Sequence, residues 1–137
     1  MNTIKASITE IKRHQNVSAL SFDALGSTMN MVALELDDTL QIGREVILTA
    51  KATNISLAKE IESQMSISNQ LQGVVQELTN GIILCSVKVR VQSTLLESII
   101  TQNSAVKMDI KVGDKIIVLI KASDVSIAPF EKLGETL

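Results

Sequence analysis

The chain has 137 residues, 45% of them hydrophobic, with a formal net charge of −2 and a pI near 5.4. This composition supports a folded core, and it gives no positive field that would collect nucleic acid. Aromatic platforms on which bases could stack are also scarce, because Phe22 and Phe130 are the only aromatic residues.

The N-terminal segment MNTIKASITEIKRHQ lacks the apolar stretch of a secretory leader, and no run approaches the roughly 20 apolar residues of a membrane helix. We therefore expect a cytoplasmic protein in which the single Cys85 is a reduced core thiol. The single His14 lies in the polar run KRHQN and is expected to be solvated. One His and one Cys supply neither a metal cluster nor a nucleophile–base pair, so we expect no enzyme and no directly coordinated metal cation.

A short segment is written twice. KATNISLA begins at Lys51, and KASDVSIA begins at Lys121. Gly43 and Gly113 precede these lysines at the same distance, and the runs between them, REVILTA and DKIIVLI, are typical of strands. Nearer the start, ASITEI (6–11) matches GVVQEL (73–78) at a slightly shorter spacing. The chain is therefore interpreted as a duplication whose second copy has three extra residues in its middle.

Each copy reads as five short strands. In the second copy, LQGVVQEL and IILCSVKVRVQ flank Thr79–Asn80–Gly81, which predicts a tight hairpin with left-handed residues. LLESIIT, KIIVLIK and VSIA follow as strands, and NSAVKMDIKVG predicts one helical turn capped by Asn103 or Ser104.

These elements predict an all-β fold of two tandem small OB-like Greek-key barrels, each with about five strands and a short helical turn. We place the first barrel at 1–62 and the second at 63–137, with the polar run KEIESQMSIS between them. Units this small bury little surface alone, so we expect a homo-oligomer.

Three polar clusters distinguish the second copy: SISNQ (66–70), TQNS (101–104) and KAS (121–123). They offer hydroxyls, backbone N–H groups and one ammonium, and they contain no carboxylate. Such a donor set suits a small tetrahedral oxyanion better than a cation. On composition alone, ordinary capping of strand ends is the commoner reason for Ser and Thr at these places.

MSISNQLQGVV, followed later by VGDKIIVLIKASDVSIA, resembles the Mop or TOBE family of molybdate-binding domains, the molbindins. The resemblance spans residues 66–128. Because the closing half is repeated, the whole chain is similar to a tandem, or di-Mop, protein and to the effector-binding portion of the molybdate-dependent transcription regulator.

The resemblance implies an oxyanion site at a lobe or subunit interface. One side would supply the Ser66 hydroxyl, the Lys121 ammonium and the backbone N–H of Ala122. The other side would supply the hydroxyls of Thr101 and Ser104. Ser123, next to that N–H group, is expected to be an extra donor.

Ser68 stands where the family pattern has an arginine, and its hydroxyl replaces a charged fork. A charge-assisted hydrogen bond contributes roughly 1.5–3 kcal/mol, so binding about tenfold to a hundredfold weaker, or more dependent on Lys121, is expected.

The first copy is expected to lack a working site. We align Met31 and Leu34 with Thr101 and Ser104, and Asp37 and Asp38 follow closely. Apolar side chains donate nothing to an oxyanion, and carboxylates repel it. Only Lys51 and Ala52 are expected to keep the family's shape.

The resemblance thus implies a cytoplasmic molybdate- or tungstate-binding protein that stores, buffers or senses the oxyanion, without catalysis and without a covalent cofactor. The implied partners are the oxyanion and further copies of the chain, as a dimer or trimer, with no direct nucleic-acid binding and no membrane. The alternative is an effector-binding or oligomerisation module of a molybdate-responsive regulator or a transporter, with or without a ligand of its own.

Overall fold

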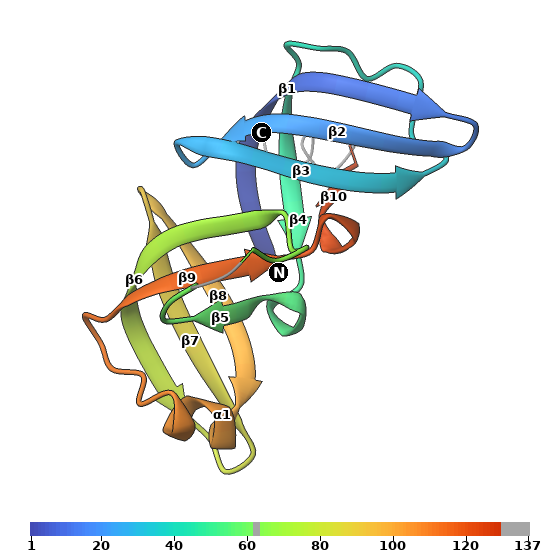
Figure 1. The fold of residues 1–137 in the computed structure, drawn as a ribbon. Coiled ribbons are helices and arrows are strands. Elements are labelled where there is room, and N and C mark those ends of the chain that lie inside the picture. The colour runs from blue at the N-terminus through green and yellow to red at the C-terminus, as the bar shows by residue number, and fades with distance from the viewer. Residues whose placement is uncertain (62–63, 130–137) are drawn as a thin grey trace.

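The computed structural model describes residues 1–61 and 64–129 as a mostly β protein of two strongly curved sheets (Figure 1). The first repeat contains β1 (Asn2–His14), β2 (Val17–Ala24), β3 (Ser27–Leu34), β4 (Glu45–Ala50), the 3-10 turn η1 (Ala52–Asn54) and β5 (Ser56–Ala58). The second contains β6 (Asn69–Asn80), β7 (Leu84–Val91), β8 (Thr94–Thr101), α1 (Gln102–Lys107), β9 (Lys115–Ile120), the 3-10 turn η2 (Ala122–Asp124) and β10 (Ser126–Ile127).

Each sheet contains one strand that comes from the other repeat. The strand orders are β10–β4–β1–β2–β3 and β5–β9–β6–β7–β8, so the prediction of two five-stranded barrels is confirmed. β10 pairs with β4 through Ser126 and Thr49, and β5 pairs with β9 through Ser56 and Leu119. The segment that the sequence repeats most closely is therefore the segment that the two repeats exchange.

The predicted boundary at 62/63 falls in the connector between β5 and β6, and these two residues lie outside the described parts of the chain. The division into 1–62 and 63–137 stays a prediction. The two sheets do not follow this division, because β5 of the first repeat belongs to the second sheet and β10 of the second repeat belongs to the first.

The glycines that the repeats share occupy the same place in both barrels. Gly43 and Gly113 have φ values of 90° and 95°, which glycine adopts without strain. Gly43 N donates to Ile8 O at 2.7 Å, and Gly113 N donates to Val75 O at 2.8 Å. Both carbonyls lie beside the irregularity where the long first strand of each barrel changes partner. The two repeats therefore share this glycine hydrogen bond as well as their strand pattern.

The hairpin between β6 and β7 differs from its prediction. Neither Asn80 nor Gly81 has a positive φ, and β7 begins at Leu84 rather than at Ile82. Gly81 is required instead by close approach, since a Cβ there would lie 2.6 Å from the Leu84 carbonyl oxygen. That oxygen accepts a hydrogen bond from Gly81 N at 2.8 Å and closes the turn.

The core consists of the alternate side chains of these strands, and Val87, Val89 and Val91 are buried as the strict alternation of VKVRV implies. Cys85 is also buried, and desolvation raises the pKa of its thiol, as expected of a core cysteine. His14 is exposed at the end of β1. Phe130 lies outside the described residues.

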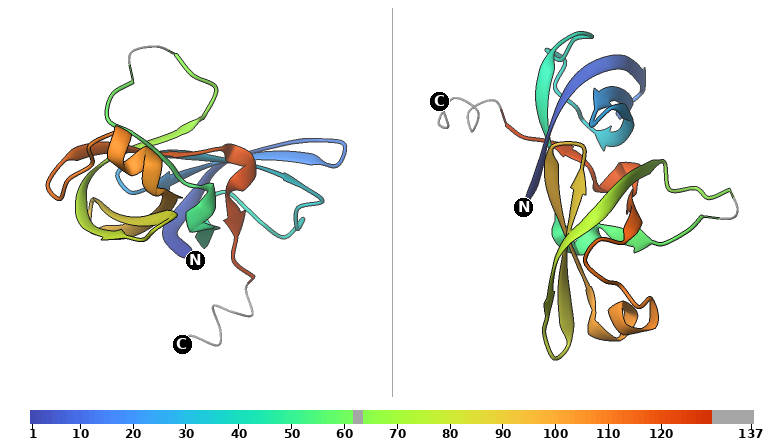
Figure 2. Two further views of the ribbon diagram at one scale, coloured as in Figure 1. Left: turned by 90° about the horizontal axis from the view of Figure 1, so that it is seen from below. Right: turned by 90° about the vertical axis from the view of Figure 1, so that its left-hand side faces the viewer.

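Figures 1 and 2 show the two barrels meeting near the N-terminus of the chain. Two asparagine side chains join them. The Asn2 amide donates to Glu97 O at 2.8 Å and accepts from Glu97 N at 2.7 Å. The Asn69 amide does the same with the backbone of Asn30, at 2.9 and 2.7 Å. Asn2 and Asn69 occupy equivalent positions in the two repeats, and so do Asn30 and Glu97. The two barrels are therefore related by an internal pseudo-two-fold arrangement.

Candidate functional site

One group of predicted donors lies where β6 begins and β9 ends. Asn69 at the start of β6 pairs with Ile120 at the end of β9. Ser68 and Lys121, the neighbouring residues just outside the two strands, therefore lie at the same end of these strands. Ser66, Ser68 and Lys121 are all exposed. The Gln70 amide donates to Ile67 O at 2.9 Å and orders the loop between the serines. We call Ser66, Ser68, Lys121 and Ala122 the lysine end.

The backbone at Lys121 has the same conformation as at its counterpart in the first repeat. Lys121 has φ −65° and ψ 143°, and Lys51 has φ −71° and ψ 139°; each precedes a 3-10 turn. Asp124 N donates to Lys121 O at 2.9 Å, and Asn54 N donates to Lys51 O at 2.9 Å. Lys51 therefore has the backbone conformation of Lys121, and the prediction that Lys51 and Ala52 keep the family's shape stays a prediction.

The second group of donors lies at the start of α1. The helical turn is confirmed, but its predicted cap is wrong: Thr101, not Asn103 or Ser104, is the N-cap. Its hydroxyl accepts from Ser104 N at 3.1 Å and donates to Ser104 Oγ at 2.8 Å. This bond uses one of the two hydroxyl protons, so the pair keeps one further hydroxyl proton outside the bond. We call Thr101 and Ser104 the hydroxyl end.

The lysine end and the hydroxyl end lie at opposite ends of the second barrel. Thr101 pairs with Leu84, and Cys85 pairs with Asn80 at the far end of β6. Eleven residue steps of about 3.3 Å separate Asn80 from Asn69, a span on the order of 30 Å. Figure 1 shows α1 at the outer end of this barrel and β9 ending near the middle of the molecule. A single chain therefore does not bring the predicted donors together.

Ser123 lies in the wall of a small cavity that the sequence did not reveal. The cavity has a volume of about 150 Å³ and is lined by Lys51, Asn54 and Thr49 of the first repeat together with Ser123 and Asp124. It exists because β10 is exchanged, which carries η2 to the first sheet. The carboxylate of Asp124 makes this cavity less suitable for an oxyanion than a carboxylate-free site.

The strand register corrects the alignment of the first repeat. Leu34 pairs with Val17 as Thr101 pairs with Leu84, so Leu34 and Asp37 are the counterparts of Thr101 and Ser104; Met31 is a buried core residue. The three extra residues of the second repeat lie after β8, where α1 replaces a loop. An apolar side chain and a carboxylate therefore stand where the hydroxyl end would be.

The loop of the first repeat is held in place by Arg13. Its guanidinium donates to Asp37 O at 3.2 Å and to Asp38 Oδ1 at 3.3 Å. Asp37 Oδ1 accepts from Thr39 N at 2.9 Å, and this backbone hydrogen bond lowers the pKa of the Asp37 carboxyl. Asp37 thus stays ionised at neutral pH and would repel an anion.

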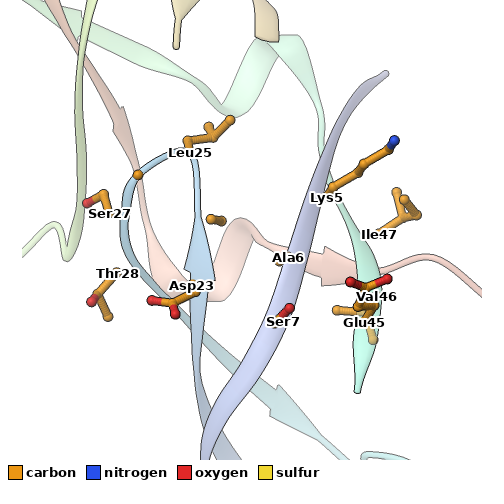
Figure 3. A pocket seen from close by; sticks show the side chains of 12 residues that line it. Lys5, Ala6, Ser7, Asp23, Leu25, Ser27, Thr28, Glu45, Val46 and Ile47 are labelled. Carbon is orange, nitrogen blue, oxygen red and sulfur yellow. The ribbon is translucent and has the colours of Figure 1, made fainter. Parts of the chain in front are cut away.

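A larger cavity, of about 820 Å³, opens in the first barrel where β1 separates from β2 beyond the pair Ser7–Asp23 (Figure 3). Its wall includes Asp23 and Glu45 and none of the predicted site residues. Two carboxylates and one lysine, Lys5, leave it without a positive excess, so it does not suit an oxyanion.

Within residues 1–61 and 64–129, no three His, Cys, Asp or Glu side chains gather closely enough to hold a metal ion. The helices of this same part of the chain are too short to cross a membrane.

By its fold, the chain is a β protein of two tandem barrels, and each barrel contains the last strand of the other repeat. Residues 65–127, which contain most of the second barrel, match the model of the TOBE domain family.

The whole chain is similar in structure to the cytoplasmic molybdate-binding protein ModG, solved with molybdate bound. The TM-score is 0.87 with 22% sequence identity, over 93% of this chain and 94% of that chain. This likeness shows a shared two-barrel fold. A molybdate-binding protein from Sporomusa ovata aligns over 49% of this chain and 100% of its own, with 27% identity and a TM-score of 0.48. No curated protein matches the sequence.

Proposed function

We propose that this chain is a cytoplasmic molybdate- or tungstate-binding protein, and not an enzyme, that stores, buffers or senses the oxyanion as a homo-oligomer. The observation that carries the proposal is the pairing of Thr101 with Ser104, which leaves a hydroxyl proton at the outer end of a TOBE barrel. Such a donor complements the ammonium and N–H group of the lysine end.

The chemistry supports a tetrahedral dianion. Neutral hydroxyl and amide donors bind an oxyanion through oriented dipoles, and one ammonium offsets part of the charge. The likeness to ModG, which binds molybdate, supports this choice of oxyanion. Sulfate is smaller, so pocket size is the expected basis of discrimination, whereas molybdate and tungstate are close in size.

The proposed site needs two copies of the chain. Ser66, Lys121 and Ala122 of one copy would face Thr101 and Ser104 of another, because the two ends lie far apart within one chain. Ser68 and Ser123 are proposed as additional donors, Ser68 on the same edge as Lys121 and Ser123 in the turn that follows it.

Calorimetric titration with molybdate, tungstate and sulfate tests the proposal. We expect heat of binding with the first two and much less with sulfate. Lys121→Ala should weaken binding at least about tenfold, because it removes one charge-assisted hydrogen bond. Lys51→Ala is the matched control, since Lys51 has the same backbone conformation in the repeat that lacks the hydroxyl end.

Equal affinity for the wild type and Lys121→Ala would contradict the site. Heats no larger than the sulfate control would contradict the function as a whole. In that case the chain would be an oligomerisation module. A mobility-shift assay with and without molybdate checks the further expectation that the chain does not bind DNA directly.

A further inference from the structure

The outer end of the second barrel presents three consecutive aliphatic side chains to solvent. Ile82 is 98% exposed, Ile83 75% and Leu84 53%. They form the turn between β6 and β7 and the first residue of β7. We call these three residues the apolar tip.

The apolar tip is held rigidly and is continuous with the hydroxyl end. Gly81 N donates to Leu84 O at 2.8 Å and closes the turn. Gln102 N donates to Ile83 O at 2.8 Å, which ties the tip to the first residue of α1. Leu84 pairs directly with Thr101. Any surface that covers the tip therefore comes next to Thr101 and Ser104.

The fold itself does not require an apolar tip. The corresponding residues of the first repeat are Gln15, Asn16 and Val17, and they occupy the equivalent turn between β1 and β2. The first two of these positions are thus polar in the barrel that lacks the hydroxyl end and apolar in the barrel that has it, whereas the third is aliphatic in both. Exposed consecutive aliphatic side chains of this kind mark contact surfaces.

We infer that the apolar tip docks on the lysine end of a second copy of this chain. The inference deepens the proposed function and rests on it for the choice of occupant. The donors are divided between the two ends of the second barrel, so a second copy is the occupant that supplies what the hydroxyl end lacks. Met65, next to Ser66, is 40% exposed and offers the lysine end an apolar contact for the tip.

Such a contact joins two different surfaces. Each contact between two copies uses the apolar tip of one copy and the lysine end of the other. A closed ring of any size therefore contains one such contact, and one oxyanion site, per chain.

The test is the double variant Ile82→Gln/Ile83→Asn, which copies the polar character of the first repeat's turn into the tip. Sedimentation equilibrium and native mass spectrometry, both without oxyanion, should show an assembled wild type. We expect the variant to dissociate, with a dissociation constant raised about a hundredfold or more because two buried aliphatic side chains are lost. Ile42→Asn removes an aliphatic side chain that is 65% exposed elsewhere, and it should assemble as the wild type does. Far-UV circular dichroism verifies that each variant folds.

A monomeric wild type, or a folded double variant that assembles as tightly as the wild type, would overturn the inference. Binding of the tip to lipid vesicles by a monomeric wild type would do so as well. Because assembly is measured without oxyanion, the two proposals fail separately. A wild type that assembles through the tip but gives no heat with molybdate supports the interface and refutes the function.

Discussion

Single hydroxyls decide what the second barrel offers a ligand. Thr101 serves the fold and the site at once, since it caps α1 through Ser104 N and orients the hydroxyl of Ser104. Its counterpart Leu34 does neither, and the first repeat has a loop instead of a helix after β3. Two side chains, Leu34 for Thr101 and Asp37 for Ser104, together with the three residues that the second repeat adds after β8, thus separate a repeat without a donor pair from a repeat with one.

Ser68 gives a prediction at this scale. It is exposed at the same edge as Lys121, in the place where the family pattern has an arginine. Ser68→Arg should tighten molybdate binding by about tenfold to a hundredfold, because a guanidinium adds a charge-assisted hydrogen bond. Calorimetric titration measures the change.

The matched control is Thr3→Arg, because Thr3 is exposed near the start of β1 in the repeat without the hydroxyl end. It should leave the affinity unchanged. An unaltered affinity for Ser68→Arg, or an equal gain for both variants, would show that Ser68 does not face the oxyanion.

At the scale of elements, the two barrels are joined by edge strands whose backbone groups are bonded by asparagine side chains. β3 and β8 stand at the ends of their sheets, and each is bonded at one residue by Asn69 or Asn2. The asparagine amides thus give hydrogen-bond partners to backbone groups of an edge strand, and the same hydrogen bonds link the two barrels. Ser98 adds a further link, because its buried hydroxyl donates to Ile55 O at 2.6 Å.

Asn69→Ala should therefore lower the free energy of unfolding by about 2–5 kcal/mol, since it leaves the N–H and C=O of Asn30 without their partner in a partly buried place. Urea denaturation followed by circular dichroism measures this loss. Gln70→Ala, at an exposed neighbour with one hydrogen bond to a loop carbonyl, should change stability by less than about 1 kcal/mol. Equal effects of the two substitutions would contradict the role assigned to Asn69.

At the scale of the whole molecule, strand exchange makes the stability of each barrel depend on the other. β5 comes from the first repeat and completes the second sheet, and β10 comes from the second repeat and completes the first. The exchanged turns also touch the other barrel, η1 at β8 and η2 at β3.

We therefore expect thermal unfolding to be one cooperative transition. The calorimetric enthalpy should equal the van't Hoff enthalpy, and Leu57→Pro in β5 should lower the melting temperature of the single transition. The chain contains no Trp or Tyr, so calorimetry and far-UV circular dichroism are the suitable measurements. Two resolved transitions, one of them unaffected by Leu57→Pro, would show that the barrels are independent.

Much of the architecture follows from local patterns. The alternation around Val87, Val89 and Val91, the β-branched runs before Lys51 and Lys121, and the repeated glycines were enough to predict ten short strands in two barrels. These features are local because side-chain alternation and left-handed glycines act over a few residues. The polar clusters at Ser66, Thr101 and Lys121 could also be identified from the sequence, because the residues of each cluster are contiguous in the chain.

Other features depend on contacts between distant residues. KATNISLA and KASDVSIA are so alike that each fits the edge of either sheet, and only the folded chain shows that they are exchanged. The offset between the repeats lengthens after β8, which is why a uniform alignment placed Met31 instead of Leu34 opposite Thr101. The separation of the lysine end from the hydroxyl end depends on the length and direction of β6, and no local pattern encodes it. Pairing partners are chosen by the global packing of both repeats, and that choice divides the donors between the two ends of one barrel.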